Sequence, residues 1–405
     1  MLKQKYFLTG IFILSAERQP IKLAWRKIVW LLKMVHKIIH LLLLFAYIEN
    51  VDYFCRKLLY NMNIVYLIGN GFDINLGLNT RYCDFYKYYL ESQQSDNSNP
   101  HIKALKKSLK TFLDQIPLLN TKDECAKWSD LEFALGEYTK DFKSVSEFQT
   151  IYYDLYDNLA DYIEQESDKL VTFENVSQLY NDLISPENHL PSLDKNIIRD
   201  YGSKWNNTSQ WNVNIITFNY TLTIEQLLGY QNKQLSLGKN RYGHPIILNS
   251  INHIHGTVNE HMLLGVNDIL QIGNESFRDN QALQNILVKP QTNKMLKELI
   301  DVRCKKIIQE ANLICLFGLS LGDTDSIWWK LIGEQLKKNN TMILYFAKGE
   351  EIPKRRFHLM GNKEIELKEY LLSKSELSIE EKKNIQDKIF IGYNTKIFSL
   401  SQKWD

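Results

Sequence analysis

Four groups of polar side chains each follow a short apolar stretch, and they contain the residue types that acid–base and ligand-binding chemistry requires. They are Asn70 and Asp73 after YLI, Asn219, Tyr220 and Thr221 after NIITF, His255 with Gly256 after INHI, and Ser320, Asp323 and Asp325 after LICLFG. In open α/β sheets, ligands bind outside the carboxyl ends of the strands. A single polar turn after a strand is common, but the four groups together predict one cleft.

Two histidines with strand spacing, His253 and His255, allow two kinds of chemistry. On one face of a strand they are candidates for a metal site, although zinc usually needs three protein ligands and no third one stands beside them. His255, directly before Gly256, better suits a general base, because imidazole titrates near neutral pH. A metal-dependent phosphohydrolase that uses both histidines with Asp73 and Asp323 is the alternative.

The glycine-rich turn after the first apolar stretch is the expected ligand-binding turn. Residues 64–68 have the pattern of a buried strand, which runs into Gly69-Asn70-Gly71-Phe72-Asp73. Two glycines let a ligand approach the backbone closely, and free amides at the start of a following helix bind phosphate. Ile74 stands where the dinucleotide fingerprint has its third glycine. Asn70 and Asp73 also suit a purely structural role as turn formers.

Two acidic segments lie at expected helix starts. In the stretch WSDLE, Asp130 and Glu132 point either into the cleft or to solvent on an exposed helix face. Asp323, Thr324 and Asp325 precede the helical stretch SIWWKLIGEQLKK, so at least one of them is expected to cap that helix.

The apolar periodicity of the chain predicts the elements that position these turns. Further strands are expected at 213–218, 251–254, 313–317 and 342–346, and helices at 293–309 and 325–338. This alternation predicts an α/β fold with a Rossmann-like, mainly parallel sheet and helices on both faces. Helical stretches at 82–92, 101–118, 128–142 and 145–170 indicate a large helical insertion at 83–210. The core domain is therefore expected at 62–350, with a helical tail at 351–405 that contains an edge strand at 389–400.

The composition is that of an ordinary globular protein. The 405 residues are 44% hydrophobic and 24% charged, which allows a sizeable core and little disorder. Five scattered cysteines without zinc spacing favour a reducing cytoplasm. Residues 62–405 are mildly acidic, so there is no electrostatic reason to expect nucleic-acid binding. Whether the chain forms a homo-oligomer stays open.

Residues 1–61 form a separate apolar and basic extension, with ten Lys and Arg against three acidic residues. Its longest uninterrupted apolar run, 41–48, is far too short to cross a bilayer. One interpretation is a basic amphipathic helix that makes weak membrane contact through 20–48. A second is a signal anchor, although there is no clear small-residue cleavage site. A third is that translation begins at Met62, directly before the first strand, so that 1–61 is absent from the native protein.

Six stretches of the chain, in order, resemble the AbiH family of bacterial phage abortive-infection proteins. They are IGNGFDINLGLNTRYCDF at 68–85, WSDLE at 128–132, ITFNYT at 216–221, HIHG at 253–256, LGVND at 264–268 and FGLSLGDTD at 317–325. That family is in turn similar to sirtuin-like NAD-consuming domains, in which a glycine turn, an asparagine and a His-Gly pair follow successive strands. The resemblance implies that Asn219 and His255 are the catalytic pair and that Gly69, Asn70, Gly71, Phe72 and Asp73 bind the nucleotide.

The resemblance implies an antiphage effector that takes NAD as substrate and hydrolyses it at the nicotinamide–ribose bond. Asn219 would position the ribose or the attacking water, His255 would act as base, and the Gly69 and Gly71 amides would hold the pyrophosphate. Ser320, Asp323 and Asp325 would bind ribose hydroxyls or complete the cleft. The turn reads GNGFD rather than Gly-Ala-Gly-x-Ser, and the paired C-x-x-C zinc module is absent, which argues against protein deacylation. A non-catalytic nucleotide-binding sensor that acts through a partner is a further alternative.

Overall fold

The computed structural model describes Met34 and residues 61–93, 98–115, 130–170, 176–338, 341–356 and 358–400. The chain divides into two compact units, Met1–Tyr60 and Asn61–Asp405. The expectations for the extension 1–61, with its membrane contact through 20–48, lie outside the described residues apart from Met34 and Asn61. Within the described ranges, no helix combines the length and the apolar character that crossing a membrane requires.

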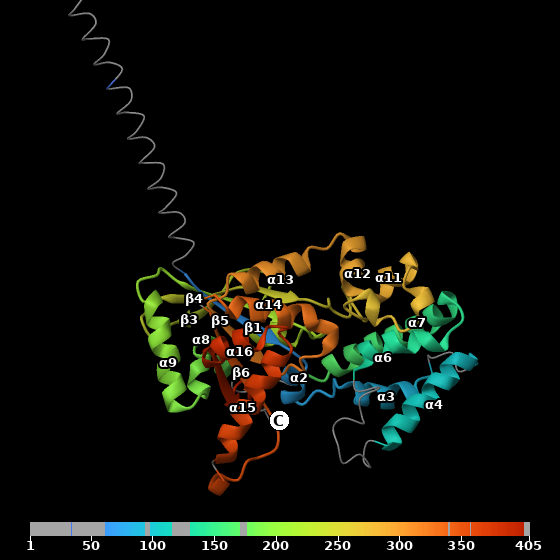
Figure 1. Ribbon diagram of the computed structural model, residues 1–405, viewed down its shortest axis with the longest axis horizontal. Coiled ribbons are helices and arrows are strands. Elements are labelled where there is room, and N and C mark those ends of the chain that lie inside the picture. Colours follow the sequence, from blue (N-terminus) through green and yellow to red (C-terminus); the bar gives the residue numbers. More distant parts are fainter. Residues whose placement is uncertain are drawn as a thin grey trace, which may run out of the picture. The chain divides into compact units, whose positions relative to one another are not determined.

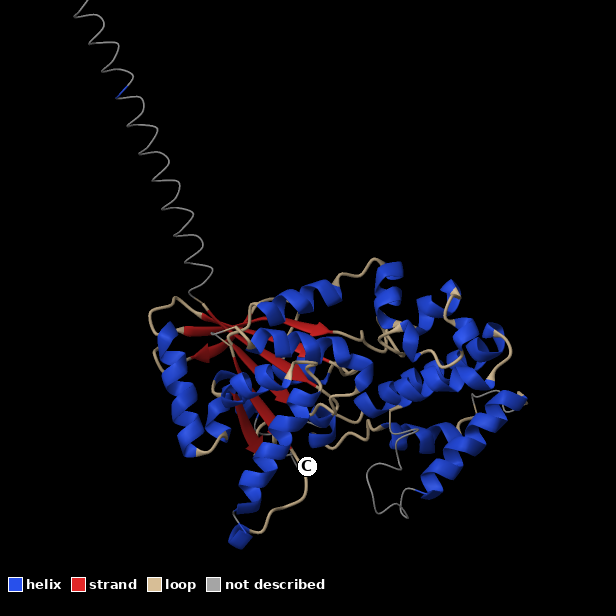
Figure 2. Cartoon of the chain, viewed as in Figure 1, coloured by secondary structure: helices blue, strands red, loops and turns tan. Residues whose placement is uncertain are grey.

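A seven-stranded sheet forms the centre of the described part of the second unit (Figures 1 and 2). Its strands are β1 (Met62–Ile68), β2 (Trp211–Thr217), β3 (Leu235–Lys239), β4 (Pro245–His253), β5 (Leu313–Phe317), β6 (Met342–Ala347) and β7 (Ile389–Tyr393). The order is β3-β4-β2-β1-β5-β6-β7, and every neighbouring pair is parallel except β3 with β4. The predicted α/β fold with a Rossmann-like, mainly parallel sheet is confirmed.

The register of the strands brings four turns to one edge of the sheet. Ile68, the last residue of β1, pairs with Thr217 of β2 and with Phe317 of β5. Thr217 in turn pairs with His253 at the end of β4. These four strands therefore end level with one another, and the polar segments that follow them leave the sheet side by side, as the cleft hypothesis requires.

Helices cover both faces of the sheet, because alternate residues of β1 point to opposite sides. Tyr66 belongs to one core with α2 (Gly71–Asn75), α8 (Val176–Ile184), α9 (Ser192–Gly202) and α10 (Thr223–Leu228). Leu67 belongs to the core on the other face, with α13 (Ile300–Gln309), α14 (Ser326–Leu336), α15 (His358–Ser373) and α16 (Ile379–Ile385). Short 3-10 turns lie at Thr139–Asp141, Pro186–His189, Ser203–Trp205, Ile269–Gln271, Glu275–Phe277, Asp323–Asp325 (η7), Lys354–Arg356 and Gln386–Lys388.

A third core belongs to a helical lobe beside the sheet, seen on the right of Figure 1. It contains α3 (Tyr82–Glu91), α4 (Pro100–Gln115), α6 (Leu131–Tyr138), α7 (Val145–Ser167), α11 (Gln281–Leu287) and α12 (Lys289–Leu296). The predicted insertion at 83–210 is therefore not one structural body. Its second half, α8 and α9, covers the sheet, and the lobe is completed by α11 and α12, which come after β4.

Two local predictions differ from the structure. The helix expected at 293–309 is split, because Lys297 adopts φ 58° and ends α12 before α13 begins at Ile300. The strand expected at 251–254 is the end of a longer strand, β4, which forms an antiparallel hairpin with β3. The edge strand expected near the C-terminus is present as β7, which pairs with β6.

Candidate functional site

The turn 69–73 packs tightly against the end of β5. The amide of Gly69 donates to the Phe317 carbonyl and the amide of Gly71 donates to the Gly318 carbonyl, both at 2.9 Å. Both amides are thus engaged with backbone, so their expected use as phosphate donors requires these two hydrogen bonds to open. The glycines serve close packing, since a Cβ on Gly69 would lie 2.5 Å from the Gly318 oxygen.

Asn70 and Phe72, which were expected to contact a nucleotide, have structural roles. The Asn70 side chain donates to the Thr80 carbonyl at 2.7 Å and accepts a hydrogen bond from the Thr80 hydroxyl, so it fixes the following loop. Phe72 is fully buried, and its ring lies edge-on to those of Phe317 and Phe398. The turn-former interpretation thus holds for Asn70, and Phe72 is a core residue.

Asp73 and Asn219 lie together beneath the same edge of the sheet, and both keep hydrogen-bonding capacity unused. The Thr221 hydroxyl donates to Asp73 Oδ2 at 2.8 Å. Asp73 Oδ1 and both side-chain atoms of Asn219 are buried and have no hydrogen-bond partner among the described residues. Burial raises the pKa of Asp73 to about 6, although Thr221, Thr223 and Asn219 oppose the rise. Orphaned buried polar groups are rare and costly, and they are often found at functional sites.

His253 adjoins this pair and engages its own acidic partner. Its Nε2 lies 2.8 Å from Glu225 Oε1, and its Nδ1 lies 3.0 Å from the Asn219 carbonyl oxygen. Burial disfavours the imidazolium, but the hydrogen bond and charge of Glu225 raise the pKa of His253 above its ordinary value. We call Asp73, Asn219, Thr221, Glu225 and His253 the aspartate–asparagine cluster.

The ligand set of the predicted metal alternative is not assembled. His253 binds Glu225, His255 binds Asp325, and the exposed Asp323 forms an ion pair with Lys374. Among the described residues, no three His, Cys, Asp or Glu side chains are grouped so that they could hold a metal ion. His253 and His255 thus serve two different polar clusters.

His255 lies in a buried ionic cluster with Asp325 and Lys289. Its Nε2 is 2.9 Å from Asp325 Oδ1 and 3.1 Å from Lys289 Nζ, and Lys289 Nζ is also 3.1 Å from Asp325 Oδ1. Asp325 occupies the start of α14, but its side chain does not cap that helix. Burial alone would raise the pKa of Asp325, yet the charges of Lys289 and His255 hold it below its ordinary value.

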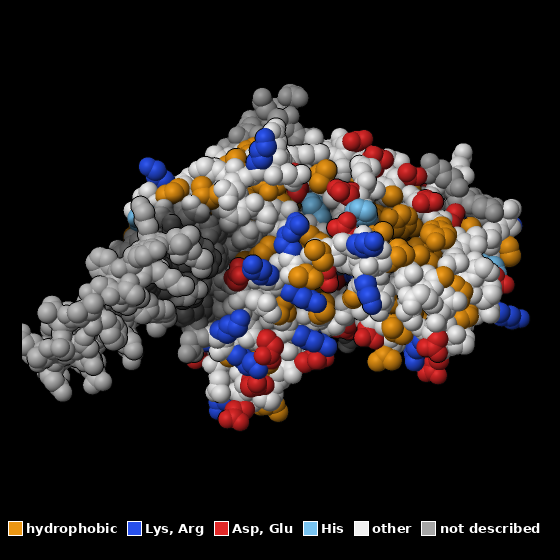
Figure 3. Space-filling view, turned by 90° about the horizontal axis from the view of Figure 1, so that it is seen from above, with side chains coloured by type: hydrophobic (Ala, Val, Ile, Leu, Met, Phe, Trp, Pro, Cys, Tyr) orange, Lys and Arg blue, Asp and Glu red, His pale blue; other side chains and the backbone are white. Residues whose placement is uncertain are grey.

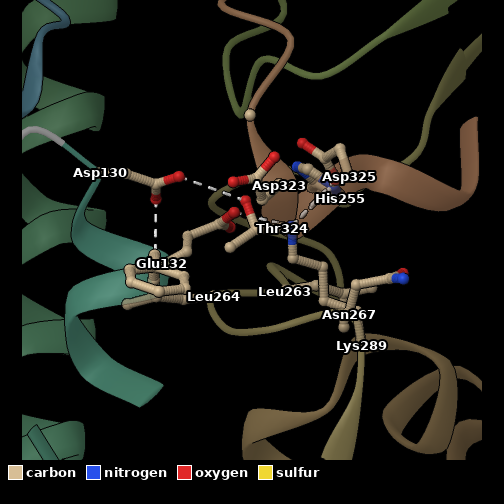
Figure 4. Close-up of polar contacts among 12 residues, drawn as sticks. Asp130, Glu132, His255, Leu263, Leu264, Asn267, Lys289, Asp323, Thr324 and Asp325 are labelled. Atoms are coloured by element: carbon tan, nitrogen blue, oxygen red, sulfur yellow. Dashed lines mark hydrogen bonds and ion pairs between the residues drawn. The ribbon is translucent and has the colours of Figure 1, made fainter. Parts of the chain in front are cut away.

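The helical lobe contributes the remaining members of this cluster. Glu132 of α6, expected either at the cleft or in solvent, is only 4% exposed and accepts from Lys289 at 2.7 Å. The Tyr220 hydroxyl donates to Glu132 at 3.2 Å and to the Leu263 carbonyl at 2.9 Å. We call Glu132, Tyr220, His255, Lys289 and Asp325 the lysine–histidine cluster. Figure 4 shows Lys289 reaching from α12 toward His255 and Asp325, with Asp130 and Glu132 facing them from α6.

Asp130 stands at the rim of the lysine–histidine cluster. It caps α6 by accepting from the Phe133 amide at 3.1 Å, and its other oxygen lies 3.5 Å from the Thr324 hydroxyl. Burial, followed by the negative charge of Glu132, raises the pKa of Asp130 to about 6. A carboxyl group that titrates near neutral pH at a lobe boundary is available for proton transfer.

The two clusters meet at the segment after β2. The rings of Phe218 and Tyr220 both contact the His255 ring, at 5.5 and 6.3 Å between centroids, and Asn219 lies between them in sequence. The expected catalytic pair, Asn219 and His255, is therefore brought to the same edge of the sheet but divided between the clusters. As predicted, distant segments of the chain meet at one edge of the sheet, where they place Asp73, Asn219, His255 and Asp325.

Ser320 and Asp323 are not part of either cluster. Ser320 is exposed, and its carbonyl accepts from Tyr370 at 2.8 Å. The Asp323 side chain is 69% exposed and lies 2.8 Å from Lys374. Acidic and basic side chains also lie among one another on the face of the molecule seen in Figure 3. The expectation that these two residues complete the cleft is therefore not supported by their contacts.

Lys289 is the main functional candidate that the sequence did not reveal. Its one local signal is its position directly after the apolar run at 286–288. Its partners Glu132, His255 and Asp325 are 157, 34 and 36 residues away, so no local pattern could identify them.

A comparison with known protein families gives a match that covers most of the core. Residues 65–347 match the family model described as bacteriophage abortive infection AbiH. No curated protein matches the chain. The matched range contains every member of both clusters and runs from β1 to the end of β6. Because the family model covers well over half of the sequence, the chain belongs to the AbiH family of bacteriophage abortive infection proteins.

Proposed function

We propose that this abortive infection protein binds a nucleotide such as NAD at the carboxyl edge of the sheet and hydrolyses its nicotinamide–ribose bond. The observation that carries the proposal is the orphaned pair of Asp73 and Asn219 at the ends of β1 and β2. An ionised carboxylate only accepts hydrogen bonds, whereas an amide side chain both donates and accepts. A ribose hydroxyl can satisfy both groups, because it donates to Asp73 Oδ1 and accepts from Asn219 Nδ2.

The lysine–histidine cluster supplies a base for the reaction. The described contacts of the His255 imidazole all use Nε2, so Nδ1 is the nitrogen open to a proton. When the bond between C1′ and the nicotinamide nitrogen breaks, nicotinamide leaves with the bonding electrons and the ribosyl centre becomes electron-deficient. Water adds its oxygen to C1′, and His255 takes the released proton. The products are nicotinamide and ADP-ribose, and no oxidant or reductant is consumed.

The test is the release of nicotinamide by the purified full chain incubated with NAD, measured by chromatography. We expect the release to fall by about 100-fold or more in His255→Ala, the typical range for loss of a general base. Asn219→Ala is expected to fall comparably, because the ribose loses its orienting partner. His244→Ala is the matched control, since His244 is a half-buried histidine outside both clusters whose ring contacts the Asn206 carbonyl.

The outcomes distinguish the proposed NAD hydrolase from a nucleotide-binding sensor. Equal release by both site variants and the wild type would remove the proposed roles. NAD binding by calorimetry without release would favour the nucleotide-binding sensor. Measuring NAD in phage-infected bacteria that express the wild type or His255→Ala covers the case in which an infection signal is needed. Undiminished NAD with the wild type, together with no binding, would overturn the proposal.

A further inference from the structure

Lys289 is held inside the site by two carboxylates. Its ammonium group donates to Glu132 Oε2 at 2.7 Å and to Asp325 Oδ1 at 3.1 Å, and it lies 3.1 Å from His255 Nε2, the nitrogen that faces Asp325. The Lys289 side chain is only 7% exposed. A lysine in such a position is held by its partners rather than by solvent, so its location relative to His255 is fixed.

The surroundings keep Lys289 charged. Burial opposes the ammonium form, but the charges of Asp325 and Glu132 outweigh it and raise the pKa of Lys289 above its ordinary value. A permanent positive charge therefore lies next to the ring nitrogen of His255 that faces Asp325. An aspartate alone beside a histidine would stabilise the imidazolium, whereas a neighbouring ammonium disfavours it.

We infer that Lys289 is a positioning residue that acts through His255: it offsets the charge of Asp325 and keeps the imidazole neutral, with Nδ1 ready to accept a proton. This inference rests on the proposed function for the role of His255 as base. Glu132 holds the ammonium from the helical lobe, so the lobe completes the site. The charged and titratable groups that face His255 are Asp325 before α14, Lys289 on α12, Glu132 and Asp130 on α6, and Tyr220 after β2.

The experiment is a pH titration of His255 by nuclear magnetic resonance in protein labelled with ¹⁵N-histidine, with the signal assigned from His255→Ala. In Lys289→Met the midpoint is expected to move to higher pH by on the order of one unit, since the opposing cation is gone. Lys289→Arg keeps the charge and is expected to stay near the wild type. Lys294→Met, an exposed lysine on the same helix, is the matched control.

Removing one partner of a buried ion pair strongly destabilises a protein. A second set of variants therefore tests the inference if Lys289→Met does not fold. Glu132→Gln leaves a hydrogen-bonding partner for Tyr220 and removes the charge that Lys289 neutralises. The double variant Lys289→Met with Glu132→Gln is compared with Glu132→Gln alone, and the midpoint is again expected to be higher without Lys289. A midpoint that is the same with and without Lys289 in both comparisons would overturn the inference, as would a shift in Lys289→Arg as large as in Lys289→Met.

The readout distinguishes this inference from the proposed function. The titration requires no turnover of NAD, so it gives a result even if the wild type releases no nicotinamide. In that case the proposed function fails, and the midpoint of the His255 titration alone decides whether Lys289 disfavours the imidazolium. If nicotinamide is released, the acidic limb of the pH–rate profile is expected to shift upward in Lys289→Met together with the titration.

Discussion

Gly71 lies so close to Gly318 that a Cβ built on Gly71 would fall 2.4 Å from the Gly318 Cα. Gly318 itself adopts φ 68°, a conformation that glycine accepts readily. The two glycines let the turn after β1 dock on the backbone that follows β5. The turns after β1 and β5 are therefore joined by direct backbone contact.

Gly71→Ala is expected to lower the free energy of unfolding by about 2–3 kcal/mol, because the clash is with backbone and cannot be relieved by rotating a side chain. Urea unfolding measures the change. Gly361→Ala is the matched control, since a Cβ there meets nothing within 4 Å and the residue lies inside α15. That substitution is expected to be neutral or to stabilise by up to about 1 kcal/mol. Similar effects at both positions would contradict the packing account.

Asn219→Ala is expected to separate activity from stability. The buried Asn219 side-chain atoms form no well-aligned hydrogen bond among the described residues and lie near Asp73, so truncation should leave the free energy of unfolding close to that of the wild type. Asn70→Ala provides the contrast, because it removes two hydrogen bonds to Thr80 and should cost about 1–3 kcal/mol. Thermal unfolding and nicotinamide release measured on the same samples check both. A loss of stability in Asn219→Ala as large as in Asn70→Ala would mean that the amide is structural.

Asp73 should make the protein less stable as pH rises through the range from about 4 to 6. Its pKa is raised from 3.8 to about 6 in the folded state, so unfolding releases a proton within this range and the free energy of unfolding falls with pH. Two pH units correspond to roughly 3 kcal/mol. In Asp73→Asn this decline should disappear, so the stability of the variant relative to the wild type should grow from pH 4 to 6 and then level off. Urea unfolding across that range tests the sign, and a difference that does not vary with pH would contradict it.

Truncation should cost far more stability at Asp325 than at Asp323. Asp323→Ala breaks only an exposed ion pair with Lys374 and is expected to change the free energy of unfolding by less than about 1 kcal/mol. Asp325→Ala leaves Lys289 without one of its two carboxylate partners inside the protein and is expected to cost about 3–5 kcal/mol. Chemical unfolding of the two variants side by side measures this. Comparable losses would show that burial at the start of α14 matters less than the contacts indicate.

The sheet was predictable because its strands carry continuous apolar runs. The residues of β5 were predicted at their observed limits, since a strand buried on both faces has a pattern that few other structures share. The hairpin of β3 with β4 escaped prediction because β3 is short, carries Gly238 and is largely unburied, so it has no apolar run.

The site was predictable only in outline. The placement of polar residues after strands correctly indicated that Asp73, Asn219 and Asp325 share one edge of the sheet. The roles of Phe72 and Lys289 depend on partners far away in the chain, such as Phe398 and Glu132, and no local pattern contains that information. Whether such a residue packs in the core or takes part in the site depends on which distant residues the fold places against it.

The contact of Phe72 with Phe398 also determines when the turn at 69–73 can be completed during synthesis. A ribosome delivers Phe72 long before Phe398, so a growing chain lacks the ring against which Phe72 packs. The turn is therefore completed only after translation has passed β7, and products of interrupted translation would be expected to lack it.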